Sequence, residues 1–200
     1  MASMLALLSS LLWGTADFFG GNLTKKYKAL AVTGVSQSFG LLFGLIVVLV
    51  TSSWFAPTLS WNNYFLPGVL AGTLGFIGLT AFYAGLATGR MGVVSPISSL
   101  SALIPLTVAF INGEKPSTVQ LIGMIVALTG AFCASGPEIK GGISLRPLVY
   151  ALIAAFGFGT AITFIAQGSK SSAIMTMTTM RFTTFLIALA LFAKFRTAGG

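Results

Sequence analysis

Asp17 and Arg181 are the two charged residues that fall inside long apolar stretches of the sequence. An ionised side chain at the centre of a membrane-spanning helix costs roughly 2.5–3.5 kcal/mol, so such a residue usually faces water or a partner. An acid at that depth can exchange a proton, and a guanidinium can pair with an anionic or carboxylate solute. Two alternatives stay open: Asp17 can be a headgroup-level polar residue near Asn22 and Lys25, and Arg181 can extend to the membrane interface.

Two aromatic residues and two prolines are further candidates within the same stretches. Trp13 and Tyr83 offer flat faces on which a solute can stack, although aromatic side chains in membrane helices more often pack or lie at the interface. Pro96 and Pro105 each remove a backbone donor and free a carbonyl in one apolar segment, so this segment is expected to kink. It is a candidate gate, and the alternative is a kinked helix with a purely structural role.

The composition excludes most catalytic and metal-dependent sites. The 200 residues include no histidine, three acids and a single cysteine, Cys133. This set lacks the commonest metal ligand and general base and cannot form an internal disulfide. We therefore expect no enzymatic activity, no metal and no cofactor. The net charge of +8 comes from cations scattered singly between apolar runs, a pattern unlike a nucleic-acid-binding face.

The apolar residues are arranged in runs long enough to span a bilayer. Hydrophobic residues make up 56% of the chain and charged residues 7%, whereas a soluble domain carries roughly 25% charge. A helix needs about 20 apolar residues to cross the hydrocarbon core. Seven such helices are expected, over Met4–Leu23, Ala29–Val50, Leu66–Thr88, Met91–Ile111, Thr118–Ser135, Leu148–Gln167 and Ala173–Ala193. The connections are too short for a soluble domain, and the runs lack the alternation of a β-barrel.

Charge and glycine follow this pattern of helices. The loops after the first, third, fifth and seventh helices hold eight Lys and Arg residues, and the opposite loops hold Lys115 and Lys170. Since cations concentrate in cytoplasmic loops, the count favours an N-terminus outside the cell. Glycines four residues apart predict close helix packing. These pairs are Gly40/Gly44, Gly68/Gly72 and Gly85/Gly89.

Part of the first helix recurs later in the chain. At an offset of 145 residues, WGTADFFGGNLTK (13–25) aligns with FGTAITFIAQGSK (158–170) with five identities. The second copy begins five helices after the first, an odd number, so it has the opposite orientation in the membrane. Inverted repeats of this kind place a solute path between their halves near the bilayer midplane. In this register Arg181 corresponds to Ser36, which is followed in the sequence by Gln37. We therefore expect Arg181 and Gln37 to lie near one cavity.

A longer pattern of single residues extends over positions 81–132. Its members are Tyr83-Ala84, Pro96, Pro105, Glu114, Gln120, Gly123 and Gly130. With the Trp13-Gly14 pair near the start, this ordered spacing resembles the EamA-type branch of the drug/metabolite transporter superfamily. The resemblance implies ten helices in two inverted five-helix repeats, an interior cavity, and export or exchange of small metabolites or drugs. Members of that branch usually have the N-terminus inside, against the charge count, so orientation stays open.

The predicted fold class is all-α integral membrane, with residues 1–142 as a first five-helix repeat and 143–200 as two helices of an inverted second repeat. Three helices are then missing, so we expect either a fragment of a longer transporter or a second chain that completes the bundle. The predicted function is a multi-pass secondary transporter of the plasma membrane that moves a small solute, with proton coupling as an option. A seven-helix receptor is the alternative, although an opsin-like pigment would need a lysine in Ala173–Ala193, which has none.

Overall fold

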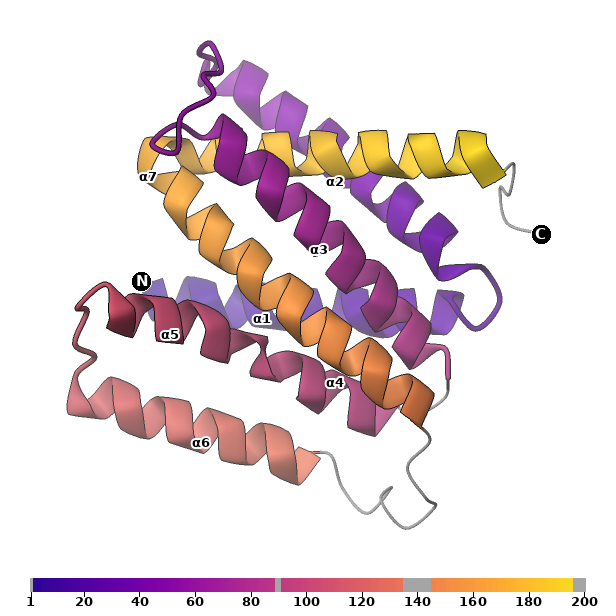
Figure 1. Ribbon diagram of the computed structural model, residues 1–200, viewed down its shortest axis with the longest axis vertical. Coiled ribbons are helices and arrows are strands. Elements are labelled where there is room, and N and C mark those ends of the chain that lie inside the picture. The colour runs from indigo at the N-terminus through magenta and orange to yellow at the C-terminus, as the bar shows by residue number, and fades with distance from the viewer. Residues whose placement is uncertain (1, 89–90, 135–144, 196–200) are drawn as a thin grey trace.

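The computed structural model describes residues 2–88, 91–134 and 145–195, and within these ranges all regular structure is helical (Figure 1). The all-α membrane fold expected from the sequence is therefore confirmed. The helices are α1 (Ala2–Leu23), α2 (Ala29–Val50), α3 (Phe65–Leu86), α4 (Met91–Ser99), the 3-10 helix η1 (Leu100–Ala102), α5 (Leu103–Ile111), α6 (Thr118–Ala134) and α7 (Leu145–Phe195).

The helices have the length and apolar character that a bilayer requires. In the described part of the chain, four single segments and the long α7 contain spans that are sufficiently long and apolar, and α6 carries a shorter apolar stretch. Large apolar side chains on the outside of the bundle are strongly exposed; Phe43 is 69% exposed and Leu49 77% exposed. An outer surface of this kind suits lipid tails. The predicted end of the fifth helix, Ser135, lies outside the described residues.

The sixth and seventh predicted helices form one continuous element, α7, with a corner at Ser172. The apolar part of α7 is 50 residues long. If straight it would measure about 75 Å, more than twice the hydrocarbon core, so the chain has to turn. Ser172 has extended backbone angles (φ −162°, ψ 116°), and α7 changes direction sharply (Figure 1). We call residues 145–171 the first limb and residues 173–195 the second limb.

One residue suffices for this corner because its side chain caps the second limb. The Met175 amide donates to Ser172 Oγ at 3.2 Å, and the Thr176 hydroxyl donates to the Ser172 carbonyl at 2.7 Å. A serine that accepts from the third residue of the following helix is a typical N-cap. The sequence suggested a loop between Gln167 and Ala173, but the first limb stays helical up to the capping serine.

The proline-containing segment is not a uniform α-helix. Between Pro96 and Pro105 the chain adopts the 3-10 helix η1, with α4 before it and α5 after it. Because Pro105 has no amide hydrogen, the carbonyl four residues earlier, at Ser101, loses its α-helical donor. The first limb of α7 packs closely here, since a Cβ added at Gly159 would lie 2.5 Å from the Ser101 carbonyl oxygen.

Helix α3 packs against both limbs of α7 through glycines. At the first limb two backbones touch: a Cβ added at Gly157 would lie 2.6 Å from the Gly78 Cα. At the second limb a Cβ at Gly72 would lie 2.7 Å from the Met180 carbonyl oxygen. Small residues allow such approach in membranes, where packing replaces the hydrophobic drive between helices. Gly89 lies outside the described residues, so the expected Gly85/Gly89 pair is assessed only at Gly85.

We expect Gly157→Leu to destabilise the protein more than a leucine placed at an open glycine. The added side chain would enter the Gly78 backbone, and overpacking typically costs about 1–3 kcal/mol. The matched control is Gly130→Leu on α6, where an added Cβ meets no atom within 4 Å. Thermal unfolding of both purified variants in detergent checks this. Equal unfolding temperatures would show that the α3–α7 crossing tolerates a larger separation.

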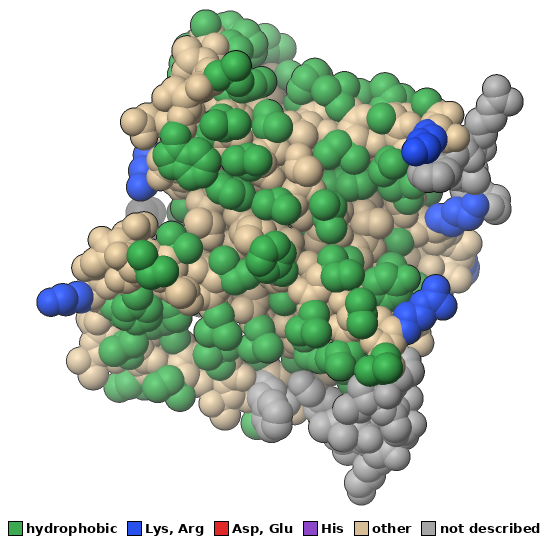
Figure 2. Space-filling view, viewed as in Figure 1, with side chains coloured by type: hydrophobic (Ala, Val, Ile, Leu, Met, Phe, Trp, Pro, Cys, Tyr) green, Lys and Arg blue, Asp and Glu red, His purple; other side chains and the backbone are tan. Residues whose placement is uncertain are grey.

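Charged side chains on the visible face lie at two opposite edges, with hydrophobic side chains between them (Figure 2). In Figure 1 the start of α1, the α5–α6 turn and the corner of α7 lie at the left edge, and the α1–α2 turn and the end of α7 lie at the right. The apolar band between two charged edges matches the profile of a bilayer with two aqueous surfaces. The long spans therefore run between these edges.

Candidate functional site

A cavity of about 290 Å³ opens between α1, α2, α3, the α4–η1 segment and α7. Most of its wall is apolar, including Phe82, Phe158 and Met180. Its polar lining consists of Asp17, Gln37, Ser95, Ser98, Ser99, Ser101, Arg181 and Thr184. A mostly apolar pocket with a few polar groups is the usual form of a small-molecule site. We call it the central cavity.

Arg181, on the second limb of α7, is fixed against α2. Its guanidinium donates from Nη1 to the Gln37 Oε1, and Gln37 is itself buried. Thr184 lies 3.4 Å from the same amide oxygen and donates its hydroxyl to the Arg181 carbonyl at 2.7 Å. The side chain passes over Gly40, where an added Cβ would lie 3.2 Å from both Cδ and Nε of Arg181. Gln37 and Gly40 therefore determine the position of the Arg181 guanidinium.

Asp17 lies on α1, half-buried, and also lines the central cavity. Trp13 lies one helical turn before it and lines the same cavity, although its side chain is 55% exposed. The structure thus places an acid and a guanidinium on one cavity, and Arg181 is hydrogen-bonded to Gln37 rather than to Asp17. An unpaired charge is costly in an apolar setting, so both groups suit a cavity that admits water or a charged solute.

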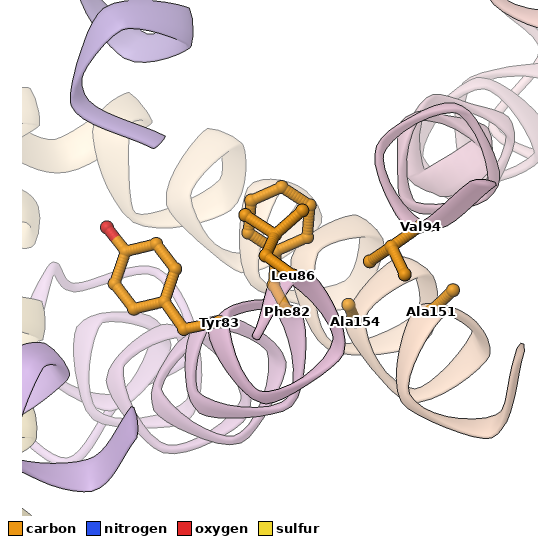
Figure 3. Close-up of a cluster of buried hydrophobic side chains, with 6 residues drawn as sticks. All are labelled: Phe82, Tyr83, Leu86, Val94, Ala151 and Ala154. Atoms are coloured by element: carbon orange, nitrogen blue, oxygen red, sulfur yellow. The ribbon is translucent and has the colours of Figure 1, made fainter. Parts of the chain in front are cut away.

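Tyr83 is not part of the central cavity. Its ring packs over α1 at Gly20, where an added Cβ would lie 2.4 Å from the ring. Tyr83 belongs to a buried cluster with Phe82, Leu86, Val94, Ala151 and Ala154, and Figure 3 shows its ring on the side opposite Val94 and the two alanines. The neighbouring Phe82 lines the cavity instead. The aromatic residues that line the central cavity are Phe82, Trp13 and Phe158, and stacking of a solute on Tyr83 stays a prediction.

The two prolines do not line the cavity, but serines of the same segment do. The Ser99 hydroxyl donates to the Pro96 carbonyl at 2.6 Å, so part of the polar backbone at this break is satisfied locally. Ser98 is 4% exposed, and its hydroxyl has no hydrogen-bond partner among the described residues. The sequence analysis did not single out Ser98, which is a buried polar group on the wall of the central cavity.

The aligned copies of the first helix meet at this cavity. In the 145-residue register Trp13 corresponds to Phe158 and Asp17 corresponds to Ile162, and all four residues line the central cavity. Phe158 was not a candidate from sequence, although the register pointed to it through Trp13. Thr184, Ser101 and Met180 carried no comparable signal, because only the packing of α7 against α2 and α4 brings them here.

A bundle of apolar helices that surrounds a small cavity lined by an acid, a guanidinium and serines is typical of a membrane protein that moves solutes. The sequence profile of the EamA-like transporter family matches residues 1–136, and the chain belongs to this family. It is accordingly a multi-pass membrane transporter of the drug/metabolite class, and the receptor alternative does not fit. No curated protein and no solved structure matches the chain significantly.

Proposed function

We propose that this transporter exports or exchanges a small anionic metabolite across the plasma membrane and couples the movement to protons through Asp17. The observation that carries the proposal is Arg181, a guanidinium held by Gln37 on the wall of a mostly apolar cavity. One N–H of the guanidinium is used by Gln37, and the fork offers further donors that match a carboxylate. The apolar wall strengthens such a pair by excluding water.

Asp17 is the candidate for proton coupling because it is the only acid in the described spans. The other described acid, Glu114, is exposed in the turn between α5 and α6. Titratable or charged groups near Asp17 are Arg181 on α7, across the cavity lining, and Tyr83 on α3, which packs against the same helix at Gly20. A carboxyl group that shares a cavity with the solute-binding cation can make proton binding and solute binding depend on each other.

The predicted inverted repeat would give this proposal its mechanism. The pairs Trp13/Phe158 and Asp17/Ile162 line one cavity from α1 and the first limb of α7, as expected for a path between two related halves. The 3-10 break between Pro96 and Pro105 is the proposed bending point, because its serines form another part of the wall. On the charge count the α1–α2 turn faces the cytoplasm and the N-terminus faces outside.

A second chain remains part of the proposal. The helix α5 has no buried residue, and most of α6 is exposed within the described part of the chain, so both present apolar surface to lipid or to another copy. Cys133, the single cysteine, is exposed on α6. Oxidative cross-linking at Cys133 in vesicles would report two α6 helices in contact, and a monomer at every protein-to-lipid ratio would argue against association through this face.

Thiol labelling can test whether the central cavity is on the solute path. In a Cys133→Ala background, Ser98→Cys puts a thiol of nearly the same size on the cavity wall, and Ser10→Cys puts one on the exposed side of α1. A charged, water-soluble thiol reagent should label the first variant and stop flux of radiolabelled organic acids in sealed vesicles, and spare the second. Full flux after complete labelling at Ser98→Cys would show that solutes do not use this cavity.

A further inference from the structure

A second hollow lies on the outer surface of the bundle, between α1 and α2. Its volume is about 380 Å³. The α1 side is formed by Ala16, Phe19, Gly20 and Leu23, and Tyr27 in the following turn closes one end. On the α2 side lie Ala31, Val32, Val35 and Ser36, and the buried Tyr83 of α3 forms the floor. We call this hollow the α1–α2 groove.

The groove follows the second half of α1 and ends at the turn between α1 and α2. The distance from Ala16 to Leu23 is seven helical residues, or about 10 Å. Its inner end lies near the middle of α1, and its outer end lies at the turn that joins α1 to α2. Phe19 is 61% exposed and Val35 55% exposed, so the groove opens toward the lipid. Its shape and lining suit a single hydrocarbon chain.

Three lysines stand at the outer end of the groove. Lys25, Lys26 and Lys28 are exposed in the turn that also carries Tyr27. The turn is held in place because the Lys26 and Tyr27 amides both donate to the Leu23 carbonyl, at 3.0 Å and 2.9 Å. The buried Thr24 hydroxyl reaches the Tyr83 carbonyl at 3.2 Å. The backbone that carries the three lysines is therefore fixed relative to the apolar groove.

We propose that the α1–α2 groove binds an anionic phospholipid, with one acyl chain lying on Tyr83 between α1 and α2 and the phosphate at Lys25, Lys26 and Lys28. The two halves of the site match the two halves of the ligand: an apolar slot at acyl-chain depth and three cations at headgroup level. Basic clusters beside a membrane helix attract anionic lipids. The site differs from a general attraction of lysines to an anionic membrane surface, because the groove gives one acyl chain a defined position.

This site also backs onto the central cavity. Three helices each contribute one residue to the groove and the next or preceding residue to the cavity: Ala16 and Asp17 on α1, Ser36 and Gln37 on α2, Tyr83 and Phe82 on α3. An acyl chain seated on Tyr83 would brace the wall that carries Asp17 and Gln37. The lipid is therefore placed to stabilise the arrangement of α1 and α2 around the cavity.

Thermal unfolding of the full chain in a neutral detergent, titrated with dioleoyl phosphatidylglycerol or dioleoyl phosphatidylcholine, tests the proposal. A ligand that binds only the folded state raises the unfolding temperature by an amount that grows with the logarithm of its concentration relative to Kd. We expect the anionic lipid to act at a concentration at least tenfold lower than the zwitterionic one. Each lysine should contribute about fivefold to that preference at low salt. Inorganic phosphate alone should have no effect.

Two sets of substitutions distinguish binding of the lipid headgroup from binding of its acyl chain. Replacing Lys25, Lys26 and Lys28 with glutamine should remove the preference for the anionic lipid, whereas the control Lys115→Gln/Lys170→Gln, at the opposite edge, should keep it. Ala31→Trp, which fills the groove, should weaken binding of both lipids, whereas Ala6→Trp on exposed α1 should not. Equal shifts by the two lipids, unchanged titrations in both groove variants, or equal stabilisation by inorganic phosphate would overturn the proposal.

Discussion

Arg181→Gln is expected to abolish most transport of anionic solutes. Removing one partner of a desolvated, hydrogen-bonded charge pair typically costs about 2–5 kcal/mol. The apparent KM for an anionic solute should therefore rise by about 30-fold or more. Glutamine can still reach toward Gln37, so the second limb of α7 keeps a hydrogen-bonding partner at this position. Initial rates of labelled organic acid uptake into vesicles, measured over a range of solute concentrations, give the change.

Two further variants distinguish binding from placement. Arg181→Lys keeps the charge but lacks the fork that can hold Gln37 and a carboxylate together, so an intermediate KM is expected. Gly40→Ala should also raise KM, because the added methyl would lie 3.2 Å from Cδ and Nε of Arg181, so the arginine side chain would have to shift. Gly44→Ala is the matched control: its closest neighbour is the Thr178 hydroxyl at 3.0 Å, away from Arg181. Unchanged KM in Arg181→Gln would remove Arg181 from solute binding.

The helices could be predicted from sequence because the bilayer imposes a length. Runs of about 20 apolar residues bounded by Lys25, Arg90 or Lys115 leave few other ways to satisfy the backbone, and the observed helices begin and end within a few residues of the predicted ones. The corner at Ser172 was harder. A single capping serine turns the chain there, and the surrounding Gly168, Lys170 and Ser171 read as an ordinary loop although they are helical.

The candidate site was only partly accessible to sequence reasoning. Charged residues in apolar runs are conspicuous, so the free-energy cost of placing a charge in the membrane was enough to identify Asp17 and Arg181. Serine and threonine carry no such signal, because both are common in membrane helices and usually bond to their own backbone, as the Thr15 hydroxyl does to the Leu11 carbonyl at 2.8 Å. Among the described residues, Ser98, Thr33 and Thr80 have buried hydroxyl groups without a hydrogen-bond partner, which is a property of the packed bundle. Tyr83 and Phe82 could not be told apart without knowing which side of α3 faces the cavity.

Asp17→Asn should uncouple transport from the proton gradient. The amide has nearly the same shape as the carboxyl group but cannot bind and release a proton, so the solute-binding cavity keeps its form and loses its titratable acid. In sealed vesicles with an imposed pH difference, the unmodified protein is expected to accumulate solute above equilibrium. The Asp17→Asn protein should only equilibrate it, with rates that do not change with pH. Solute-for-solute exchange, which needs no net proton movement, should continue in the variant.

The control acids make this result specific. Glu114→Gln removes an exposed acid in the α5–α6 turn and should leave gradient-driven accumulation intact. Asp17→Glu restores a titratable group one methylene further into the central cavity, and should recover part of the coupling. If Asp17→Asn loses exchange as well as accumulation, Asp17 acts in solute binding and not in coupling. If it still accumulates solute on a pH gradient, protons do not pass through Asp17.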